Sequence, residues 1–409
     1  MINSIRHKSV VPLIVPRAEH NISRKDISKN VIKVLYGLKD AGFEAYLVGG
    51  CIRDLLCNLQ PKDFDVATDA KPNQIKKIFR NCRLIGKRFR LAHIYFGLEI
   101  IEVATFRGGY DGSDQMKHSA HGMILRDNVY GTLEEDAFRR DFTLNALYYN
   151  IRDFSLVDYT GGMQDFNSRL IHVIGDPVVR YHEDPVRMLR ALRIAAKLGF
   201  ELEARTKRPI KNLVGLLQNV SPARLFDEVI KWFRSGKSLI AFHLLQQYGL
   251  FAVLFPQTEA GLGSVNAKVA KEFLQQGFAN TDQRILQGKK NNPAFLFAVL
   301  LWWPLQEHLE AYAKKTKKMS HYHIFMEAWH VVVQRQLERI TIPRRLISMI
   351  REIWNLQYHL EKCNDKKVLR LLNHPRFRAA YDFLLLRAAA GEEVKQVARW
   401  WTEKAVNSE

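Results

Sequence analysis

Residues 47–68, with the sequence LVGGCIRDLLCNLQPKDFDVAT, constrain the fold of this 409-residue chain more than any other segment. An apolar run ends at Gly49 and Gly50, a helical stretch follows, and a further extended run opens with D-F-D, in which Asp63 and Asp65 stand two residues apart. This order predicts a strand, a tight turn, a helix and a second strand that begins with two acids.

The two aspartates form a candidate metal site. Side chains two apart in a strand point to the same side, so Asp63 and Asp65 can present two carboxylates close together. Two hard oxygen donors suit Mg²⁺, which completes its coordination with water and substrate phosphates. The alternative interpretation is that alternating acids on an edge strand only keep it soluble.

Gly49 and Gly50 form a candidate phosphate cradle. Because they lack side chains, a triphosphate can approach the backbone N–H groups closely, and the start of the following helix offers the positive end of its dipole. Arg53 adds a cation one turn into that helix, and Asp54 follows it. A tight strand-to-helix turn without any ligand is the alternative.

The spacing of apolar residues changes along the chain. Up to about residue 160, apolar runs such as AYLVGG and EIIEVATF alternate with charged helical stretches, which predicts a mixed sheet flanked by helices. After about residue 180, apolar residues recur at spacings of three and four, which predicts an α-helical array. The expected fold class is therefore α+β, in a chain long enough for two or three units.

The motifs together resemble a known family. G-G-x-x-R-D followed by D-F-D-V-A-T resembles the head domain of the class II nucleotidyltransferases, the superfamily of bacterial poly(A) polymerases and CCA-adding enzymes. Residues 139–146 (RRDFTLNA), 158–162 (DYTGG) and 183–193 (EDPVRMLRALR) resemble further family motifs in the expected order. Residues 84–94 (LIGKRFRLAHI) and 374–388 (HPRFRAAYDFLLLRA) resemble the bacterial poly(A) polymerases in particular.

The resemblance implies a fold and an activity. It implies an N-terminal segment (1–44), a polymerase β-like nucleotidyltransferase head (45–160), a helical neck with the base pocket (161–220) and an RNA-binding body (221–409). The implied reaction is template-independent transfer of AMP from ATP to RNA 3′ ends, with release of pyrophosphate. CCA addition to tRNA is the alternative. The Lys/Arg-rich C-terminal extension expected in this group is not seen after Trp401.

The resemblance also assigns roles to residues. Asp63 and Asp65 would hold Mg²⁺, with Mn²⁺ as an alternative, in a two-metal mechanism. Asp141 is the catalytic candidate for the third acid, and Glu102 in EIIEVATF is a second candidate metal ligand. Asp141 would alternatively hold the ribose. The implied nucleotide-binding residues are Gly49, Gly50, Arg53, Asp54, Arg139, Arg140, Asp184, Arg187 and Arg190.

The segment 183–193 reads as a helix by its own chemistry. Asp184 is a suitable N-cap, Pro185 suits the first turn, and the next helix breaker is Gly199. The spacing of three then predicts that Asp184, Arg187 and Arg190 share a face. The resemblance makes this face part of the pocket for the incoming base, whereas a solvated basic face is the alternative.

Composition agrees with a polyanionic substrate. The chain has 62 Lys and Arg against 42 Asp and Glu, a formal net charge of +20 and a pI near 9.7. Such a charge attracts RNA and makes its binding salt-dependent. The resemblance implies RNA 3′ ends and ATP as partners, with RNA-degradation proteins as candidates. We expect a mobile loop at residues 108–122, which are polar and contain several glycines.

The location predicted for the protein is the cytoplasm. Four scattered cysteines without a C-x-x-C pair argue against a zinc knuckle and against a secreted disulfide framework. The apolar run at residues 10–15 is too short for a signal-peptide core or a membrane span.

Overall fold

The structure is a computed structural model that describes residues 10–86, 90–108, 117–118, 124–126, 129–263, 267–315, 319–362 and 364–406. The chain divides into two compact units, one of Met1–Arg187 with Leu198–Leu213 and the other of Met188–Lys197 with Val214–Glu409. The boundaries at residues 44, 160 and 220 remain a prediction. Most of the loop predicted at residues 108–122 lies outside the described residues.

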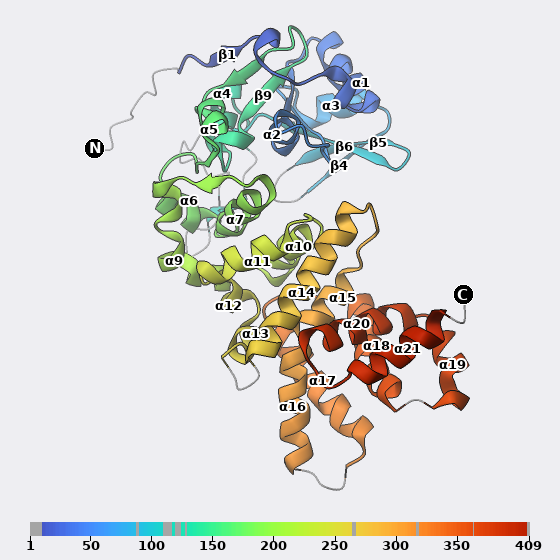
Figure 1. Cartoon of the computed structure of the whole chain (residues 1–409). Helices are drawn as coiled ribbons and strands as arrows, with labels where there is room; N and C mark the ends of the chain where they lie inside the picture. The colour runs from blue at the N-terminus through green and yellow to red at the C-terminus, as the bar shows by residue number, and fades with distance from the viewer. Residues whose placement is uncertain are drawn as a thin grey trace. The chain divides into compact units, whose positions relative to one another are not determined.

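The first unit is built around an eight-stranded sheet with the order β1-β10-β9-β2-β3-β6-β5-β4 (Figure 1). Strands β3 and β6 are parallel, and the other neighbouring pairs are antiparallel. The mixed sheet predicted from the sequence is thus confirmed. Its strands are β1 (Leu13–Val15), β2 (Ala45–Val48), β3 (Asp65–Thr68), β4 (Cys82–Ile85), β5 (Leu91–Phe96), β6 (Glu99–Thr105), β9 (Leu147–Asn150) and β10 (Leu156–Asp158).

The two faces of this sheet carry different helices. On one face, α1 (Lys29–Asp40), α2 (Gly50–Leu56) and α3 (Pro72–Ile78) pack on a core that includes Leu47 and Val66. On the opposite face, Leu133 and Ala137 of α4 (Leu133–Arg139) pack on a smaller cluster around Val48 and Tyr148. Period-two alternation along the strands produces this division, since successive side chains point to opposite faces.

Short elements complete the first unit. Two further strand pairs lie outside the main sheet: β7 pairs with β8, and β11 pairs with β12. The remaining elements are η1 (Arg17–Glu19), η2 (Arg24–Asp26), β7 (Lys117–His118), β8 (Ile124–Arg126), η3 (Thr143–Asn145), α5 (Gly162–Ser168), β11 (Leu170–Ile171), α6 (Pro177–Glu183), the start of α7 (Val186–Leu198), β12 (Glu201–Leu202), α8 (Ala204–Lys207) and α9 (Ile210–Leu213).

The second unit is helical in every regular element that the structure describes, as the sequence predicted (Figure 1). Besides most of α7, it comprises η4 (Val214–Asn219), α10 (Pro222–Phe233), α11 (Ser238–Gln247), α12 (Leu250–Leu254), α13 (Pro256–Gly261), α14 (Ala267–Leu286), α15 (Pro293–Leu300), α16 (Trp302–Lys315), α17 (His321–Leu337), α18 (Arg344–Glu361), η5 (Asp365–Lys367), α19 (Val368–Leu372), α20 (Phe377–Ala390) and α21 (Lys395–Val406).

Amphipathic spacing explains how these helices pack. Helix α10 starts with Pro222 and buries Leu225, Val229 and Trp232, which recur at spacings of three and four. Trp401 is fully buried in another cluster, and its indole N–H donates to the Leu360 carbonyl oxygen at 3.0 Å. No helix in the described part of the chain is both long enough and apolar enough to cross a membrane.

Candidate active site

Of the two predicted metal-binding aspartates, Asp65 is the first residue of β3 and Asp63 stands two residues before it. Asp63 and Asp65 are exposed, whereas Phe64 between them and Val66 after them are buried in the core beneath the sheet. Apolar side chains on one side of the strand thus leave both carboxylates facing solvent. Alternation along the chain accounts for the exposure of both aspartates.

The sheet register places Glu102 next to Asp65. The two residues are paired on the parallel strands β3 and β6, so their side chains leave the sheet on the same face. Glu102 is in turn paired with His93 on β5, and His93 Nε2 lies 3.3 Å from Glu102 Oε1. The Glu102 side chain remains 49% exposed.

These carboxylates fit a divalent cation. Asp63 and Asp65 supply hard oxygen ligands, which is enough for Mg²⁺ because it takes its remaining ligands from water and phosphates. Within the residues that the structure describes, no group of three or more His, Cys, Asp and Glu side chains is arranged to hold a metal ion. A complete coordination sphere would therefore need oxygen atoms from the substrate or from water.

The glycine turn lies directly against Asp65. Gly49 has φ +85° and ψ −144°, a backbone conformation that is almost exclusive to glycine, and α2 begins at the next residue. A Cβ atom on Gly49 would lie 3.4 Å from Asp65 Oδ2 and 3.8 Å from Arg140 Nη1. Backbone, carboxylate and guanidinium therefore meet at one point on the surface of the first unit.

Arg53 and Asp54 are buried beneath this turn. Their side chains form an ion pair at 2.8 Å with exposures of only 6% and 7%. Arg53 Nη1 also donates to Asn145 Oδ1 at 2.7 Å, and Asn145 Nδ2 donates to Asp141 Oδ1 at 3.0 Å. A hydrogen-bonded chain thus connects the G-G-x-x-R-D motif to Asp141. Sequence reasoning missed Asn145, although it stands within the RRDFTLNA motif.

Arg140 is held by a buried acid that sequence reasoning also missed. Asp136 Oδ2 accepts hydrogen bonds from Arg140 Nη2 at 2.8 Å and from the Tyr148 hydroxyl at 2.7 Å. Burial opposes the charge on Asp136, but Arg140, the Tyr148 hydroxyl and the Arg107 backbone N–H together hold its pKa below the ordinary value. The four-residue spacing from Asp136 to Arg140 in a helical stretch was the available signal.

The same partners fix the charge of Arg140. Burial disfavours the cation, yet Tyr148 and Asp136 raise the pKa of Arg140 above its ordinary value. Burial raises the pKa of Tyr148 well above 10, so this hydroxyl stays protonated and acts as a donor to Asp136. Arg140 is consequently a permanent cation beside the Gly49 turn.

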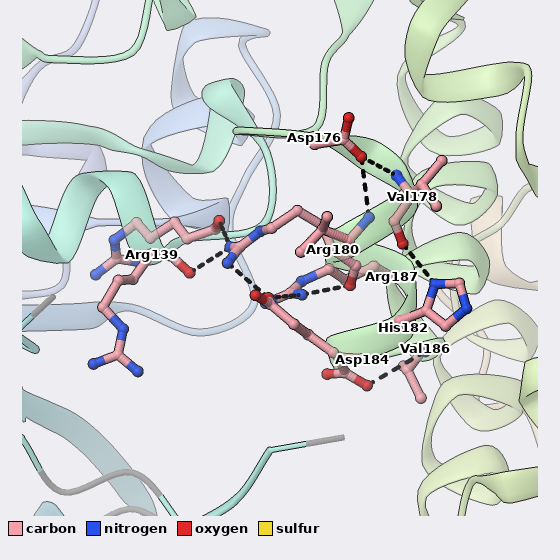
Figure 2. A network of polar contacts seen from close by, with 11 residues as sticks. Arg139, Asp176, Val178, Arg180, His182, Asp184, Val186 and Arg187 are labelled. Atoms are coloured by element: carbon pink, nitrogen blue, oxygen red, sulfur yellow. Dashed lines mark hydrogen bonds and ion pairs between the residues drawn. The ribbon is translucent and has the colours of Figure 1, made fainter. Parts of the chain in front are cut away.

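Arg180 of α6 donates hydrogen bonds to the backbone of the RRD motif at residues 139–141. Its Nη2 donates to the Arg139 carbonyl oxygen at 2.7 Å and to the Arg140 carbonyl oxygen at 2.5 Å. Figure 2 shows the Arg180 guanidinium pointing at these carbonyl groups. Arg139 itself donates to the Gly108 carbonyl oxygen. Arg180 lay just before the motif at 183–193 and was not singled out from the sequence.

Glu183 joins Arg180 to Arg187. Its Oε2 accepts from Arg180 Nη1 and from Arg187 Nη1, both at 2.9 Å. Arg187 also donates to the Arg180 carbonyl oxygen at 2.6 Å and is 9% exposed. The predicted base-pocket residue Arg187 is thus anchored to α6 by the same carboxylate that holds Arg180. Figure 2 shows the two arginines close together.

Asp184 lies between α6 and α7. Its backbone N–H donates to the Arg180 carbonyl oxygen at 3.1 Å, and its Oδ1 accepts from the Val186 N–H at 3.4 Å, in the manner of an N-cap. Arg190 belongs to the second unit. There, burial opposes the charge on Glu228, but Arg193, Lys231 and Arg190 hold the pKa of Glu228 below its ordinary value.

Comparison with known proteins gives consistent results. Residues 45–172 match the family model of the poly A polymerase head domain, 199–262 that of a probable RNA- and SrmB-binding site of polymerase A, and 317–409 that of the polymerase A arginine-rich C-terminus. The chain is 47% identical over 396 residues to poly(A) polymerase I of Salmonella typhimurium, covering 95% of this chain and 85% of the relative.

Two further matches extend this result. Poly(A) polymerase I of Haemophilus influenzae is 47% identical over 395 residues, which is 95% of this chain and 87% of the relative. The crystal structure of the Bacillus stearothermophilus CCA-adding enzyme in complex with CTP aligns with a TM-score of 0.60 and 22% identity, covering 93% of this chain and 83% of that one. At this identity the second match shows the shared fold alone.

The match of residues 45–172 to the poly A polymerase head domain, on a mixed sheet followed by a helical unit, identifies the chain as a nucleotidyltransferase. Within this class, the identity over nearly the whole chain decides the branch. The chain belongs to the bacterial poly(A) polymerase I family.

Proposed function

We propose that this chain adds AMP from ATP to the 3′ end of RNA without a template. The RNA 3′-oxygen attacks the α-phosphorus of ATP, the bond between that phosphorus and the β-phosphate oxygen breaks, and pyrophosphate leaves. The observation that carries the proposal is the meeting of the Gly49 turn, Asp65 and Arg140 at one point. A nucleotidyl transfer needs this combination of phosphate-binding backbone, carboxylate and cation.

Asp63 and Asp65 are the proposed metal ligands. When bound, Mg²⁺ or Mn²⁺ lowers the pKa of the attacking hydroxyl and neutralises charge on the phosphates. Glu102 is the further candidate ligand because of its register beside Asp65, although the three carboxylates are not arranged in the described structure to hold an ion by themselves. Asp141 is oriented by the Asn145 amide and the Phe142 N–H, which both donate to its Oδ1, and this supports a role in holding the ribose.

Arg140 and Gly49 are proposed to bind the triphosphate. Arg140 keeps its charge through Asp136 and Tyr148, so it can offer a preorganised cation to the phosphates. Gly50 supplies the first N–H group of α2, and a helix start favours an anion. The buried pair of Arg53 and Asp54 supports this turn from below.

The incoming adenine is proposed to contact the segment around α6 and α7. Asp184 and Arg187 are positioned in the first unit, and Arg187 is anchored by Glu183. Arg190, the third residue that the resemblance assigns to base binding, lies in the second unit. Its fork of N–H donors suits hydrogen bonds to a base edge.

RNA is proposed to bind the helical unit as well as the head. The net charge of +20 supports this, as does the match of residues 199–262 to a family model for an RNA-binding segment. RNA-degradation proteins are proposed as partners and the cytoplasm as the location. Cys51, Cys57 and Cys82 are not joined in disulfide bonds, which supports that location.

The proposal can be tested by extension of a labelled, unstructured RNA with Mg²⁺ and each nucleoside triphosphate separately, alongside a tRNA that lacks its CCA end. We expect long products with ATP alone. Asp63→Ala should abolish transfer and leave RNA affinity close to that of the wild type, because the carboxylate acts mainly in the transition state. Asp40→Ala, which removes an exposed acid of the same unit, is the matched control and should remain active.

Three outcomes would contradict parts of the proposal. Addition that stops after CCA on the tRNA would assign the chain to the CCA-adding enzymes. No extension with any nucleotide would refute nucleotidyl transfer. Near-normal transfer by Asp63→Ala would refute the metal-ligand assignment.

A further inference from the structure

The face of the sheet that carries Asp65 and Glu102 continues across β5 and β4. Backbone pairing joins Asp65 to Glu102, Glu102 to His93, and His93 to Arg83. Paired residues of neighbouring strands project to the same face, so these four side chains form one row. The row runs from the proposed metal site to the edge strand β4.

Aromatic and basic side chains lie together at the far end of this row. Tyr95 of β5 is paired with Ile100 of β6. Because these residues lie two positions along their strands from His93 and Glu102, their side chains project to the same face. The Arg83 guanidinium carbon lies 5.4 Å from the centre of the Tyr95 ring, and the His93 ring centre lies 6.3 Å from it. We call Arg83, His93, Tyr95 and Ile100 the β5 shelf.

The β5 shelf is open and its backbone is held in place. Arg83 is exposed, Tyr95 is half-buried and Ile100 is 45% exposed, whereas the His93 side chain is only 14% exposed. The Tyr95 carbonyl oxygen accepts from Asn81 Nδ2 at 2.6 Å, and the Tyr95 N–H donates to the Asn81 carbonyl oxygen at 3.1 Å. A fixed strand that presents an aromatic ring, a guanidinium and an apolar side chain is suited to a planar ligand that carries negative charge.

We propose that the β5 shelf binds a base and phosphate of the RNA close to its 3′ end. Aromatic rings on a sheet surface stack on bases of single-stranded RNA, and an adjacent arginine adds cation–π and phosphate contacts. Since neighbouring strands are about 4.8 Å apart, the His93 position lies about 10 Å from Asp65. This inference rests on the proposed function, because the metal site at Asp65 defines where the RNA 3′ end must be.

The geometry favours RNA over ATP as the ligand of the β5 shelf. The Gly49 turn, where the triphosphate is proposed to bind, follows β2, which is the neighbour of β3 on one side. The β5 shelf lies on β6, β5 and β4, which are on the other side of β3. The reacting phosphate at Asp65 would thus have ATP on the β2 side and the RNA on the β5 side.

The test separates RNA binding from ATP binding. The dissociation constant of an unstructured oligoribonucleotide with a fluorescent base near its 3′ end is measured on Asp63→Ala protein, with and without Tyr95→Ala, Tyr95→Phe or Arg83→Gln. The KM values for RNA and ATP are measured in the otherwise wild-type protein. Leu98→Ala is the matched control, because Leu98 is fully exposed at the turn of the same β5–β6 hairpin.

We expect Tyr95→Ala to weaken RNA binding about tenfold, as loss of one stacked base does, and Tyr95→Phe to keep most of the affinity. Arg83→Gln should raise the KM for RNA, while the KM for ATP stays unchanged in all variants. Unchanged RNA binding by Tyr95→Ala and Arg83→Gln, with unaltered melting temperatures, would overturn the proposal. A rise in the KM for ATP alone would overturn it too.

Failure of the β5 shelf inference can be distinguished from failure of the proposed nucleotidyl transfer. If the wild type extends RNA with ATP but the shelf variants bind RNA normally, only the shelf inference fails. If the wild type adds no nucleotide while Tyr95→Ala still weakens RNA binding, nucleotidyl transfer fails and the shelf stands as an RNA-binding site.

Discussion

Replacing Asp136 by asparagine removes the charge that balances Arg140 while preserving the shape of the side chain. Asp136 accepts from Arg140 Nε and Nη2 at 3.1 and 2.8 Å, from the Tyr148 hydroxyl at 2.7 Å and from the Arg107 N–H at 3.1 Å. An asparagine has one carbonyl oxygen, so its amide group must face at least one of these donors. At least one buried donor would then lose its acceptor.

The size of the expected destabilisation follows from the burial of the Asp136–Arg140 ion pair. Removing one partner of a buried ion pair costs about 3–5 kcal/mol. The Asp136 side chain is 8% exposed, but that of Arg140 is 22% exposed, so water can compensate part of the loss. We therefore expect Asp136→Asn to lower the free energy of opening of this region by about 3 kcal/mol, the lower end of that range. This corresponds to a change of about a hundredfold in the equilibrium between its closed and open states.

Amide hydrogen exchange of β2 and β9 is the appropriate assay, because these strands carry Val48 and Tyr148 in the cluster beneath α4. All seven tryptophans lie between residues 232 and 401, in the second unit. Tryptophan fluorescence should therefore report an unchanged denaturation transition of that unit, while protection in β2 and β9 falls. Asp40→Asn, which replaces an exposed acid, should leave both measurements unchanged.

The effect should depend on pH in a defined direction. Because the folded-state pKa of Asp136 is lowered, its contribution is present above the ordinary value of 3.8 and is lost as the pH falls through the folded-state value. The difference between wild type and Asp136→Asn should thus be constant near neutral pH and shrink on acidification below 3.8. A loss of protection under tenfold at pH 7, or a difference that grows in acid, would refute this reasoning.

Two further predictions concern residues that shape the site. Gly49→Ala should cost about 1–3 kcal/mol of backbone strain and displace the turn from Asp65, so AMP transfer should fall sharply while RNA affinity is kept. Gly97→Ala is the matched control, since Gly97 also has a positive φ of 63° but lies in a hairpin with open space around it; normal transfer by Gly49→Ala would contradict the cradle. Arg180→Ala should raise the KM for ATP about tenfold or more, because misplacing binding groups by about 1 Å can cost a hundredfold in rate. Arg180→Lys should recover only part of this, and a loss of stability with an unchanged KM would show that Arg180 has no positioning role.

Local patterns in the sequence predicted several structural features around the candidate site. The alternation of exposed Asp63 and Asp65 with buried Phe64 and Val66 follows the expected period of two, although β3 itself begins only at Asp65. Gly49 was expected at a tight turn, and its positive φ agrees with that expectation. Spacings of three and four likewise predicted the helical second unit.

Other features depended on contacts between distant parts of the chain. The sequence left Glu102 as one of two candidates for the third acid, and only the pairing of β3 with β6 placed it beside Asp65. The helical spacing of Asp136 and Arg140 was visible, but Tyr148 comes from β9 and completes the network across the sheet. Arg53 was predicted to meet phosphate, and the structure shows its guanidinium in a buried pair with Asp54.

The sequence by itself determined the alternation of strands and helices, the glycine turn, the acid pair and the strongly basic charge, because each depends on residues close in the chain or on composition alone. The tertiary structure decided which carboxylates and cations meet: Glu102 with Asp65, Asp136 with Arg140 and Tyr148, and Arg180 with the carbonyl groups of the RRD motif. The physical reason is that strand register and the packing of α4 and α6 are fixed by burial of apolar side chains throughout the unit, which no local pattern contains.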